Sequence, residues 1–221
     1  MRSENLPLQP TGQRERIGLL GNGGQAREIE GFLGIDTIIF KAVSPKFLDP
    51  GNAKIIDINS RETDHLDTAV LAVVGSPGLR RDLVSLWAGN RYTNLFISPF
   101  VSLSREDLGS GIFIAEAAVI TSGVHLGNHV HINISATVSH DVFLADYVTI
   151  GPGAHIGGGV SIDEGSFVGI GAIVKHQIKI CSGALIGAGA VVVHDITESG
   201  TYVGNPARLI SARQSWQALS D

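Results

Sequence analysis

Two adjacent side chains near the middle of the chain have the types needed for proton transfer. His140 is followed directly by Asp141, and Asn133 begins the same segment, NISATVSHD. A histidine has a reference pKa of about 6.5, so it can act as an unprotonated base at neutral pH, and a neighbouring carboxylate can orient its ring and raise its basicity. The pair is therefore a candidate general base that takes a proton from an attacking nucleophile. Asn133 either contacts a substrate or only bridges backbone groups at a turn.

A glycine-rich loop near the start of the chain has the composition of a phosphate-binding loop. Residues 21–26, GNGGQA, follow an apolar segment and match the pattern G-x-G-x-x-A. Glycines in such a loop let backbone amides and a helix N-terminus approach phosphate. A dinucleotide site would also need an acidic residue about 20 positions later to hold the ribose, whereas the next apolar segment ends in FKAV at residues 40–43. The loop therefore favours a nucleotide or nucleotide-sugar site over an NAD site, with a structural tight turn as the remaining alternative.

The elements around this loop alternate between strands and helices. Such alternation indicates a small parallel sheet, in which ligands bind in the crevice at the carboxyl ends of the strands. Gly75 follows the third predicted strand and would then face the same crevice as the glycine loop. The predicted strands are 16–20, 36–43, 68–74 and 94–97, and the predicted helices are 27–32 and 79–88.

The second half of the chain repeats every six residues. Fourteen successive hexads begin with an aliphatic residue, and the position four later is small or aliphatic throughout. Neither an amphipathic helix nor a two-sided hairpin has this period, but a short strand plus a corner, repeated around a parallel β-helix, does. The first positions are Ile114, Ile120, Leu126, Ile132, Val138, Leu144, Ile150, Ile156, Ile162, Val168, Val174, Ile180, Ile186 and Val192.

Three successive hexads form one triangular coil in this interpretation. The coils stack about 4.8 Å apart, as paired strands do, so residues one coil apart form columns along the prism. His140 is third in its hexad and is expected at an outward-facing corner. Pro152, Ile170 and Ala188 form one corner column that is small or apolar throughout.

The phase of the glycines marks the corners of the prism. The hexads contain 13 of the 28 glycines, five in the second position, one in the third and seven in the fourth. Glycine spares the chain a Cβ where the backbone must turn. In the hexad that begins at Val138, the residues Ser139, His140 and Asp141 replace glycine altogether, so we expect the chemistry at this corner.

The composition excludes several classes of protein. The chain has 221 residues and a net charge of −5, which gives no electrostatic reason to expect nucleic acid or an anionic membrane as a partner. No apolar run is long enough to span a bilayer, so no membrane insertion is expected, and the glycines lack the every-third spacing of collagen. The single cysteine, Cys181, cannot form an internal disulfide, and the polar first residues lack the apolar core of a signal peptide. We expect a cytoplasmic protein with a flexible arm over residues 1–15 and a structural role for Cys181.

The order of the two halves resembles a known family. An α/β unit that opens with this loop, followed by an uninterrupted hexapeptide prism and by GNPA at residues 204–207, is similar to the bacterial nucleotide-sugar and sialic-acid acetyltransferases. The resemblance implies an α/β domain over residues 16–98 and a left-handed parallel β-helix over 99–208, the left-handed winding being an exception to the usual crossover rule. It also implies a homotrimer with active sites between subunits. Residues 209–221 are expected to form a short terminal helix.

The resemblance also implies an activity. The chain would be an acetyl-CoA-dependent N-acetyltransferase that acts on the amino group of a nucleotide-linked 4-amino-4,6-dideoxy sugar, in polysaccharide biosynthesis such as that of O-antigen, and would need no metal. His140 would be the general base and Asp141 its partner, with direct attack on the thioester and no acyl-enzyme. The positions that match the sugar-nucleotide pocket are Gly23, Gly24, Gln25, Gly75 and Asn133, and those that match contacts to acetyl-CoA are Thr149, Ile170 and Ala188.

The residues themselves leave three alternatives open. Sugar O-acetylation of the sialic-acid type needs the same base, so the sequence does not separate amine from hydroxyl acceptors. A γ-carbonic-anhydrase-like enzyme would bind zinc through histidines; His140 and His176 lie two coils apart in one column, but Cys181 stands at the position of the third ligand. A non-catalytic sensor or scaffold would have a decayed site, and the intact His140-Asp141 pair argues against it.

Overall fold

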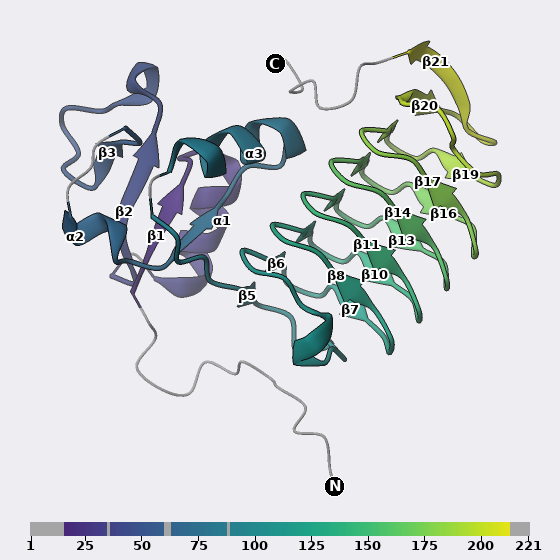
Figure 1. Ribbon diagram of the computed structural model, residues 1–221, viewed down its shortest axis with the longest axis horizontal. Helices are drawn as coiled ribbons and strands as arrows, with labels where there is room; N and C mark the ends of the chain where they lie inside the picture. The colour runs from purple at the N-terminus through teal and green to yellow at the C-terminus, as the bar shows by residue number, and fades with distance from the viewer. Residues whose placement is uncertain (1–15, 35, 60–62, 88, 213–221) are drawn as a thin grey trace, which may run out of the picture.

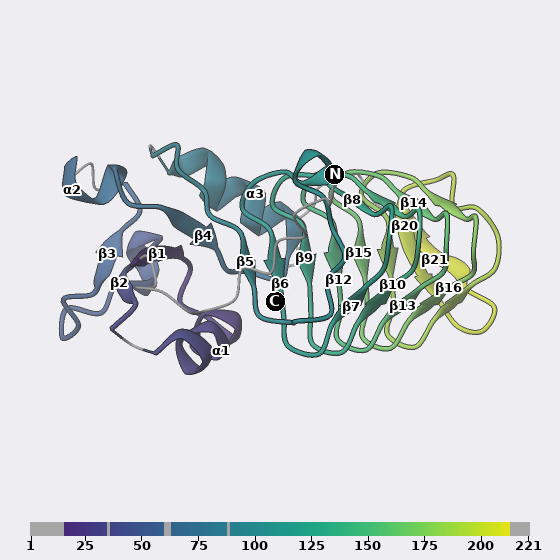
Figure 2. The same cartoon turned by 90° about the horizontal axis from the view of Figure 1, so that it is seen from below.

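The computed structural model describes residues 16–34, 36–59, 63–87 and 89–212. An α/β unit and a triangular prism of stacked coils follow one another along the chain, with the α/β unit at the end of the prism where the coils begin (Figures 1 and 2). The predicted fold class, a small parallel sheet followed by a parallel β-helix, is therefore confirmed. The expected flexible arm, residues 1–15, lies outside the described residues.

The α/β unit is built on a parallel sheet of four strands in the order β3-β2-β1-β4. Alternate side chains of the strands pack on Ile29 of α1 on one face and on Leu83 of α3 on the other. Phe113 and Ala115 of the prism are buried in the α1 cluster, so the two halves share a hydrophobic core. The elements are β1 (Ile17–Leu20), α1 (Gly24–Leu33), β2 (Ile38–Val43), η1 (Pro45–Phe47), β3 (Ile55–Asp57), α2 (Thr63–Leu66), β4 (Val70–Ala72) and α3 (Pro77–Leu86).

Both long helices begin earlier in the chain than predicted. Helix α1 begins at Gly24 directly after the glycine loop, with Gly23 as its N-cap. Helix α3 begins at Pro77, and the Ser76 hydroxyl accepts a hydrogen bond from the Leu79 amide at 3.4 Å. Proline is well suited to a first helical turn, where its missing N–H has no intrahelical partner.

The predicted strand 94–97 is wrong in its assignment to the small sheet. Strand β5 (Leu95–Phe96) pairs with the first prism strand, with Leu95 opposite Phe113. The prism sheet therefore begins before the predicted boundary at residue 99. Strand β3 and helix α2 were not predicted; with three and four residues they are too short to show a periodic pattern.

The prism contains 14 strands of two residues, each paired in parallel with a strand three places away in chain order. They form three faces. The first face contains β6, β9, β12, β15 and β18, the second β7, β10, β13, β16 and β19, and the third β8, β11, β14 and β17. The strands are β6 (Phe113–Ile114), β7 (Val119–Ile120), β8 (His125–Leu126), β9 (His131–Ile132), β10 (Thr137–Val138), β11 (Phe143–Leu144), β12 (Thr149–Ile150), β13 (His155–Ile156), β14 (Ser161–Ile162), β15 (Phe167–Val168), β16 (Ile173–Val174), β17 (Lys179–Ile180), β18 (Leu185–Ile186) and β19 (Val191–Val192).

The hexad pattern corresponds to the prism interior. Every aliphatic first position and every residue four later is buried, at 5% exposure or less. The one polar residue among them, Ser166, donates its hydroxyl to the Cys181 carbonyl at 2.9 Å. The spacing of six therefore predicted the core residue by residue.

The fourth residue of each hexad makes the corner. From Ala117 to Gly189 these thirteen residues have φ between 56° and 69°, the left-handed region that favours glycine. Seven of them are glycine, and Asp141, with φ of 59°, is one of the others. We call the corner between the first and second faces the first corner, that between the second and third faces the second corner, and that between the third and first faces the third corner.

The end of the described chain forms a hairpin. Strand β20 (Gly200–Val203) extends the first face, and β21 (Arg208–Ala212) pairs with it antiparallel. The expected terminal helix is therefore wrong over residues 209–212, and residues 213–221 lie outside the described part of the chain. None of the helices in the described ranges has the length and apolarity to cross a membrane.

Candidate active site

His140 and Asp141 lie together at the second corner, where the chain passes from β10 to β11. The Nδ1 atom of His140 is 2.8 Å from the Oδ2 atom of Asp141. Donation from Nδ1–H to the carboxylate leaves the Nε2 lone pair free to accept a proton. The two side chains are 66% and 72% exposed, so within one chain the pair is open to solvent or to a neighbouring molecule.

Gly158 fixes where the imidazole of His140 can lie. It stands one coil further along the same column as His140. A Cβ built on Gly158 would be 2.6 Å from both Cε1 and Nε2 of His140, so the ring lies directly over the glycine backbone. Gly158 is also the single glycine in the third position of any of the hexads, which is the sequence signal that could have identified it.

Replacing Gly158 with alanine is expected to lower kcat by about tenfold with little change in KM, because the new methyl group displaces the His140 ring by an ångström or so. Steady-state kinetics of the variant measure this effect. Gly31→Ala is the matched control, since a Cβ at Gly31 has no atom within 4 Å. Equal kcat values for the two variants would contradict the placement of His140 over Gly158.

The glycine loop and Gly75 meet at the edge of the α/β sheet. The loop leaves β1 and Gly75 follows β4, and these neighbouring strands are the point where the strand order reverses, which is where open parallel sheets bind ligands. A Cβ at Gly23 or Gly75 would have no atom within 4 Å, so both face open space. The first turn of α1 has no capping side chain and no acidic residue, which leaves its amides available to an anion.

Gln25 joins this crevice to the prism. Its Nε2 atom is 3.5 Å from Oδ1 of Asn133, which lies at the first corner, and Asn133 donates to the Ile150 carbonyl at 2.8 Å. The Oε1 atom of Gln25 is buried and has no hydrogen-bond partner among the described residues. The structure thus brings together two predicted site residues that are 108 positions apart, and it leaves an acceptor there for a ligand.

Lys41 lies within β2, close to where a dinucleotide-binding domain would have its ribose-binding acid. Its Nζ atom donates to Oδ1 of Asn22 at 3.0 Å and pairs with Glu30 at 2.8 Å. The lysine therefore ties the glycine loop to β2 and α1, and its charge is balanced by Glu30. The segment FKAV differs from a dinucleotide-binding sequence in its lack of an acid, and this role of Lys41 was not predicted.

Thr149 does not lie with the other residues expected to contact acetyl-CoA. It is 1% exposed under the α/β unit, and its hydroxyl donates to the Gly75 carbonyl at 2.9 Å. Assembly with further chains can only increase this burial. Ile170 and Ala188 instead lie exposed at the first corner with Pro152, each between two glycines.

The candidate site is divided between two corners of the prism. Asn133, Ile170 and Ala188 are at the first corner, and the crevice joins it through Gln25. His140 and Asp141 are at the second corner. The second face of the prism separates the two corners. One chain therefore presents the predicted binding residues and the candidate base on opposite edges of the second face.

Two further features bear on the site. Among the described residues, no group of three or more His, Cys, Asp or Glu side chains is placed to hold a metal ion.

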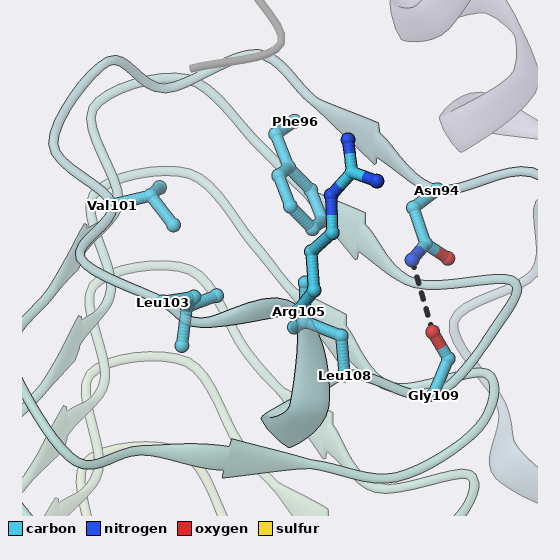
Figure 3. A pocket seen from close by; sticks show the side chains of 7 residues that line it. All are labelled: Asn94, Phe96, Val101, Leu103, Arg105, Leu108 and Gly109. Carbon is cyan, nitrogen blue, oxygen red and sulfur yellow. Dashed lines mark hydrogen bonds between the residues drawn. The ribbon is translucent and has the colours of Figure 1, made fainter. Parts of the chain in front are cut away.

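A cavity of about 290 Å³ opens in the first coil and contains none of the predicted site residues. Figure 3 shows Arg105 at this cavity and the hydrogen bond from Asn94 to the Gly109 carbonyl, 2.9 Å long. The cavity is lined by Asn94, Phe96, Val101, Leu103, Arg105, Leu108 and Gly109.

A small α/β unit followed by a hexapeptide prism is the architecture that this chain shares with solved hexapeptide-repeat acetyltransferases. Solved structures that match this chain over most of its length include bacterial sugar N-acetyltransferases of the hexapeptide family. No protein-family model matches the chain, and no curated protein matches it either.

Three of these structures show how far the similarity extends. The acetyltransferase domain of PglB from Neisseria gonorrhoeae is 28% identical with a TM-score of 0.74, covering 89% of this chain and 100% of that one. PerB from Caulobacter crescentus, solved with CoA and GDP-perosamine, is 25% identical with a TM-score of 0.75, covering 88% and 97%. WeeI from Acinetobacter baumannii is 25% identical with a TM-score of 0.67, covering 88% and 99%.

Proposed function

We propose that this protein transfers the acetyl group of acetyl-CoA to the amino group of a nucleotide-linked amino-deoxy sugar of the 4-amino-4,6-dideoxy type. The observation that carries the proposal is the exposed His140-Asp141 pair at a corner of a prism whose matching structures include an N-acetyltransferase bound to CoA and GDP-perosamine. The reaction needs no metal in this proposal. In the same proposal the reaction takes place in the cytoplasm.

The chemistry requires one base. The neutral amine of the sugar attacks the carbonyl carbon of the thioester, and Nε2 of His140 takes a proton from the amine as the C–N bond forms. The C–S bond then breaks, and the departing CoA thiolate takes the proton from the imidazolium. Asp141, at 2.8 Å from Nδ1, holds the ring in the required tautomer and stabilises its protonated form.

The crevice of the α/β unit is where we place the sugar nucleotide. Amides at the start of α1, between Gly23 and Gln25, can donate to the diphosphate, and Gly75 leaves room on the opposite side. Gln25 and Asn133 present amide groups between the crevice and the prism, and the unpartnered Oε1 of Gln25 can accept from a sugar hydroxyl.

The first corner is where we place acetyl-CoA. Ile170 is 62% exposed, and Pro152 and Ala188 continue the same column. Gly151 and Gly169 pass so close to the next coil that a Cβ would lie 2.7 Å from a backbone oxygen. The corner is therefore a narrow strip of backbone with small or apolar side chains, which suits the amides and methylenes of a pantetheine arm.

A homotrimer would complete the site. Both substrates are placed at the first corner and the crevice, whereas His140 is at the second corner. Because one face separates them, we propose that the second corner of one chain packs against the first corner of the next. A head-to-tail contact whose rotation closes gives a ring, and we propose that this ring contains three copies.

The proposed function predicts that the purified protein releases free thiol from acetyl-CoA only when a suitable amino sugar nucleotide is present. A thermal-shift panel of UDP-, GDP-, dTDP- and CMP-sugars identifies the nucleotide first, because a ligand that binds only the native state raises Tm. Mass spectrometry of the product then locates the acetyl group on nitrogen or oxygen. Acetyl-CoA turnover that is independent of every sugar, or O-acetylation alone, would contradict the proposal.

A further inference from the structure

Arg80 of α3 is a fully buried cation at the boundary between the α/β unit and the prism, with 0% of the residue exposed. All five N–H groups of its guanidinium have an acceptor. Nε donates to the His129 carbonyl at 2.9 Å, NH1 to the carbonyls of Val74 and Gly75 at 2.7 and 3.3 Å, and NH2 to the Tyr147 carbonyl and the Thr149 hydroxyl at 2.7 and 2.9 Å.

No carboxylate is among the hydrogen-bond partners of Arg80 in the described residues. Burial lowers the pKa of the guanidinium to about 9, which still leaves it charged at neutral pH. A buried charge is costly unless every donor is satisfied, and an apolar side chain would usually join two surfaces at lower cost. Unlike an apolar side chain, the guanidinium fixes how the two surfaces are oriented, because its planar donors match five acceptors at fixed angles.

The five acceptors belong to both halves of the chain. Val74 and Gly75 form the loop after β4, whereas His129, Tyr147 and Thr149 are in the prism. The Gly75 carbonyl accepts from Arg80 and also from the Thr149 hydroxyl at 2.9 Å. A hydroxyl has one proton, so Thr149 donates to Gly75 and accepts from Arg80, and this closes a ring of hydrogen bonds across the boundary.

We propose that Arg80 and Thr149 are positioning residues of the sugar-nucleotide site, which hold the Gly75 side of the crevice against the prism. The inference rests on the proposed function, because it takes the crevice as the site of the sugar nucleotide. It gives Thr149 a different role from the contact with acetyl-CoA that the family resemblance implies. Neither residue touches a substrate in this proposal, and both act through the Gly75 loop.

The two roles of Thr149 predict opposite kinetic results. Thr149→Val keeps the shape of the side chain and removes its hydroxyl. We expect KM for the sugar nucleotide to rise by about tenfold and KM for acetyl-CoA to stay within about twofold, because the loop that lines the crevice loses its register while the first corner is unchanged. A rise in KM for acetyl-CoA alone, or no change in either, would overturn the proposal.

Arg80→Met is expected to raise KM for the sugar nucleotide further than Thr149→Val does. Arg80→Lys is expected to raise this KM less than Arg80→Met, because an ammonium can still reach some of the carbonyls. Arg91→Met is the matched control. Arg91 lies in the same α/β unit and donates to the Asp67 carbonyl at 2.6 Å. An equal KM shift in the Arg91 variant would show a general loss of stability and overturn the positioning role.

A second measurement keeps this test separate from the proposed function. Hydrogen exchange of the full chain without substrate reports on the amides of residues 73–79 directly. We expect faster exchange there in Arg80→Met and Thr149→Val than in the wild type or Arg91→Met. Unchanged exchange in both variants would refute the proposal that Arg80 and Thr149 hold the Gly75 loop against the prism. If exchange is faster but the wild-type protein acetylates no sugar nucleotide, the positioning role stands and only the proposed substrate is refuted.

Discussion

Replacing His140 with alanine is expected to lower kcat by roughly 10²-fold or more while KM for both substrates changes little, because the variant loses only the group that accepts the proton of the amine. The His140 ring touches Gly158 and Asp141 and is otherwise exposed, so its removal leaves the prism intact. Thiol release from acetyl-CoA, measured with the sugar nucleotide that the thermal-shift panel selects, gives both parameters. Unchanged turnover would exclude His140 as the base.

The controls for this experiment come from the same column and from the crevice. His176→Ala removes an exposed histidine two coils further along the column and is expected to leave kcat unchanged.

Gly23→Asp adds a carboxylate to the open crevice and should abolish binding of the sugar nucleotide. If sites form between subunits, trimers that mix His140→Ala and Gly23→Asp chains contain some intact sites and regain activity. A monomer in light scattering, or no recovery on mixing, would contradict the shared site.

Acid is expected to destabilise the protein by on the order of 3 kcal/mol between pH 6.5 and 4. His129, at the third corner, is 5% exposed, and burial together with the charge of Arg80 lowers its pKa to about 4, with Asp146 opposing in part. The unfolded chain takes up a proton near pH 6.5, and the native state does so only near pH 4. Stability is therefore unaffected above this window and is lost as the pH falls through it.

The environment of His129 explains why its native form resists protonation. Its ring stacks on Tyr147 with centroids 5.0 Å apart and meets Tyr92 edge-on at 4.7 Å, and its Nδ1 atom is buried with no hydrogen-bond partner among the described residues. His131, fully buried beside Arg80, also has a pKa well below its usual value because of burial, so it acts in the same direction. Both histidines are therefore neutral at neutral pH, and both lie beside Arg80 at the boundary between the α/β unit and the prism.

Thermal unfolding from pH 7.5 to 4.5 measures this loss. His129→Asn keeps a residue type that tolerates the left-handed backbone at this position, where φ is 56°, and it should flatten the fall of Tm with pH. His155→Gln, at an exposed histidine on the second face, is the control and should retain the wild-type slope. Parallel slopes for the two variants would remove His129 from the explanation.

Much of the prism could be predicted from the sequence because its contacts repeat. Each short strand pairs with the strand one coil along, so a hexad that begins with an aliphatic residue defines its own neighbours. The same regularity indicated that Asp141 would stand in a corner position normally held by glycine, and its φ of 59° agrees. The glycine loop was likewise predictable, since a strand, a tight turn and a helix start are local features.

The boundary between the halves could not be predicted in this way. Strand β5 was assigned to the wrong sheet, and the strand β21 was expected to be a helix, because short terminal elements take their structure from whichever edge they meet. Gly158 and Lys41 were also missed, although each lies at a position the sequence had marked as unusual. Their contacts depend on which side chain of the next coil or helix faces them.

The sequence by itself determined the prism, its buried columns, the corner with His140 and Asp141, and the loop at the start of α1. Only the tertiary structure decided which face the α/β unit covers, and with it the burial of Thr149, the ring of hydrogen bonds around Arg80 and the meeting of Gln25 with Asn133. The physical reason is the range of the contacts. Those within the prism recur at a fixed separation, whereas those between the halves join non-repeating surfaces 69, 74 and 108 residues apart and have no period that a sequence could display.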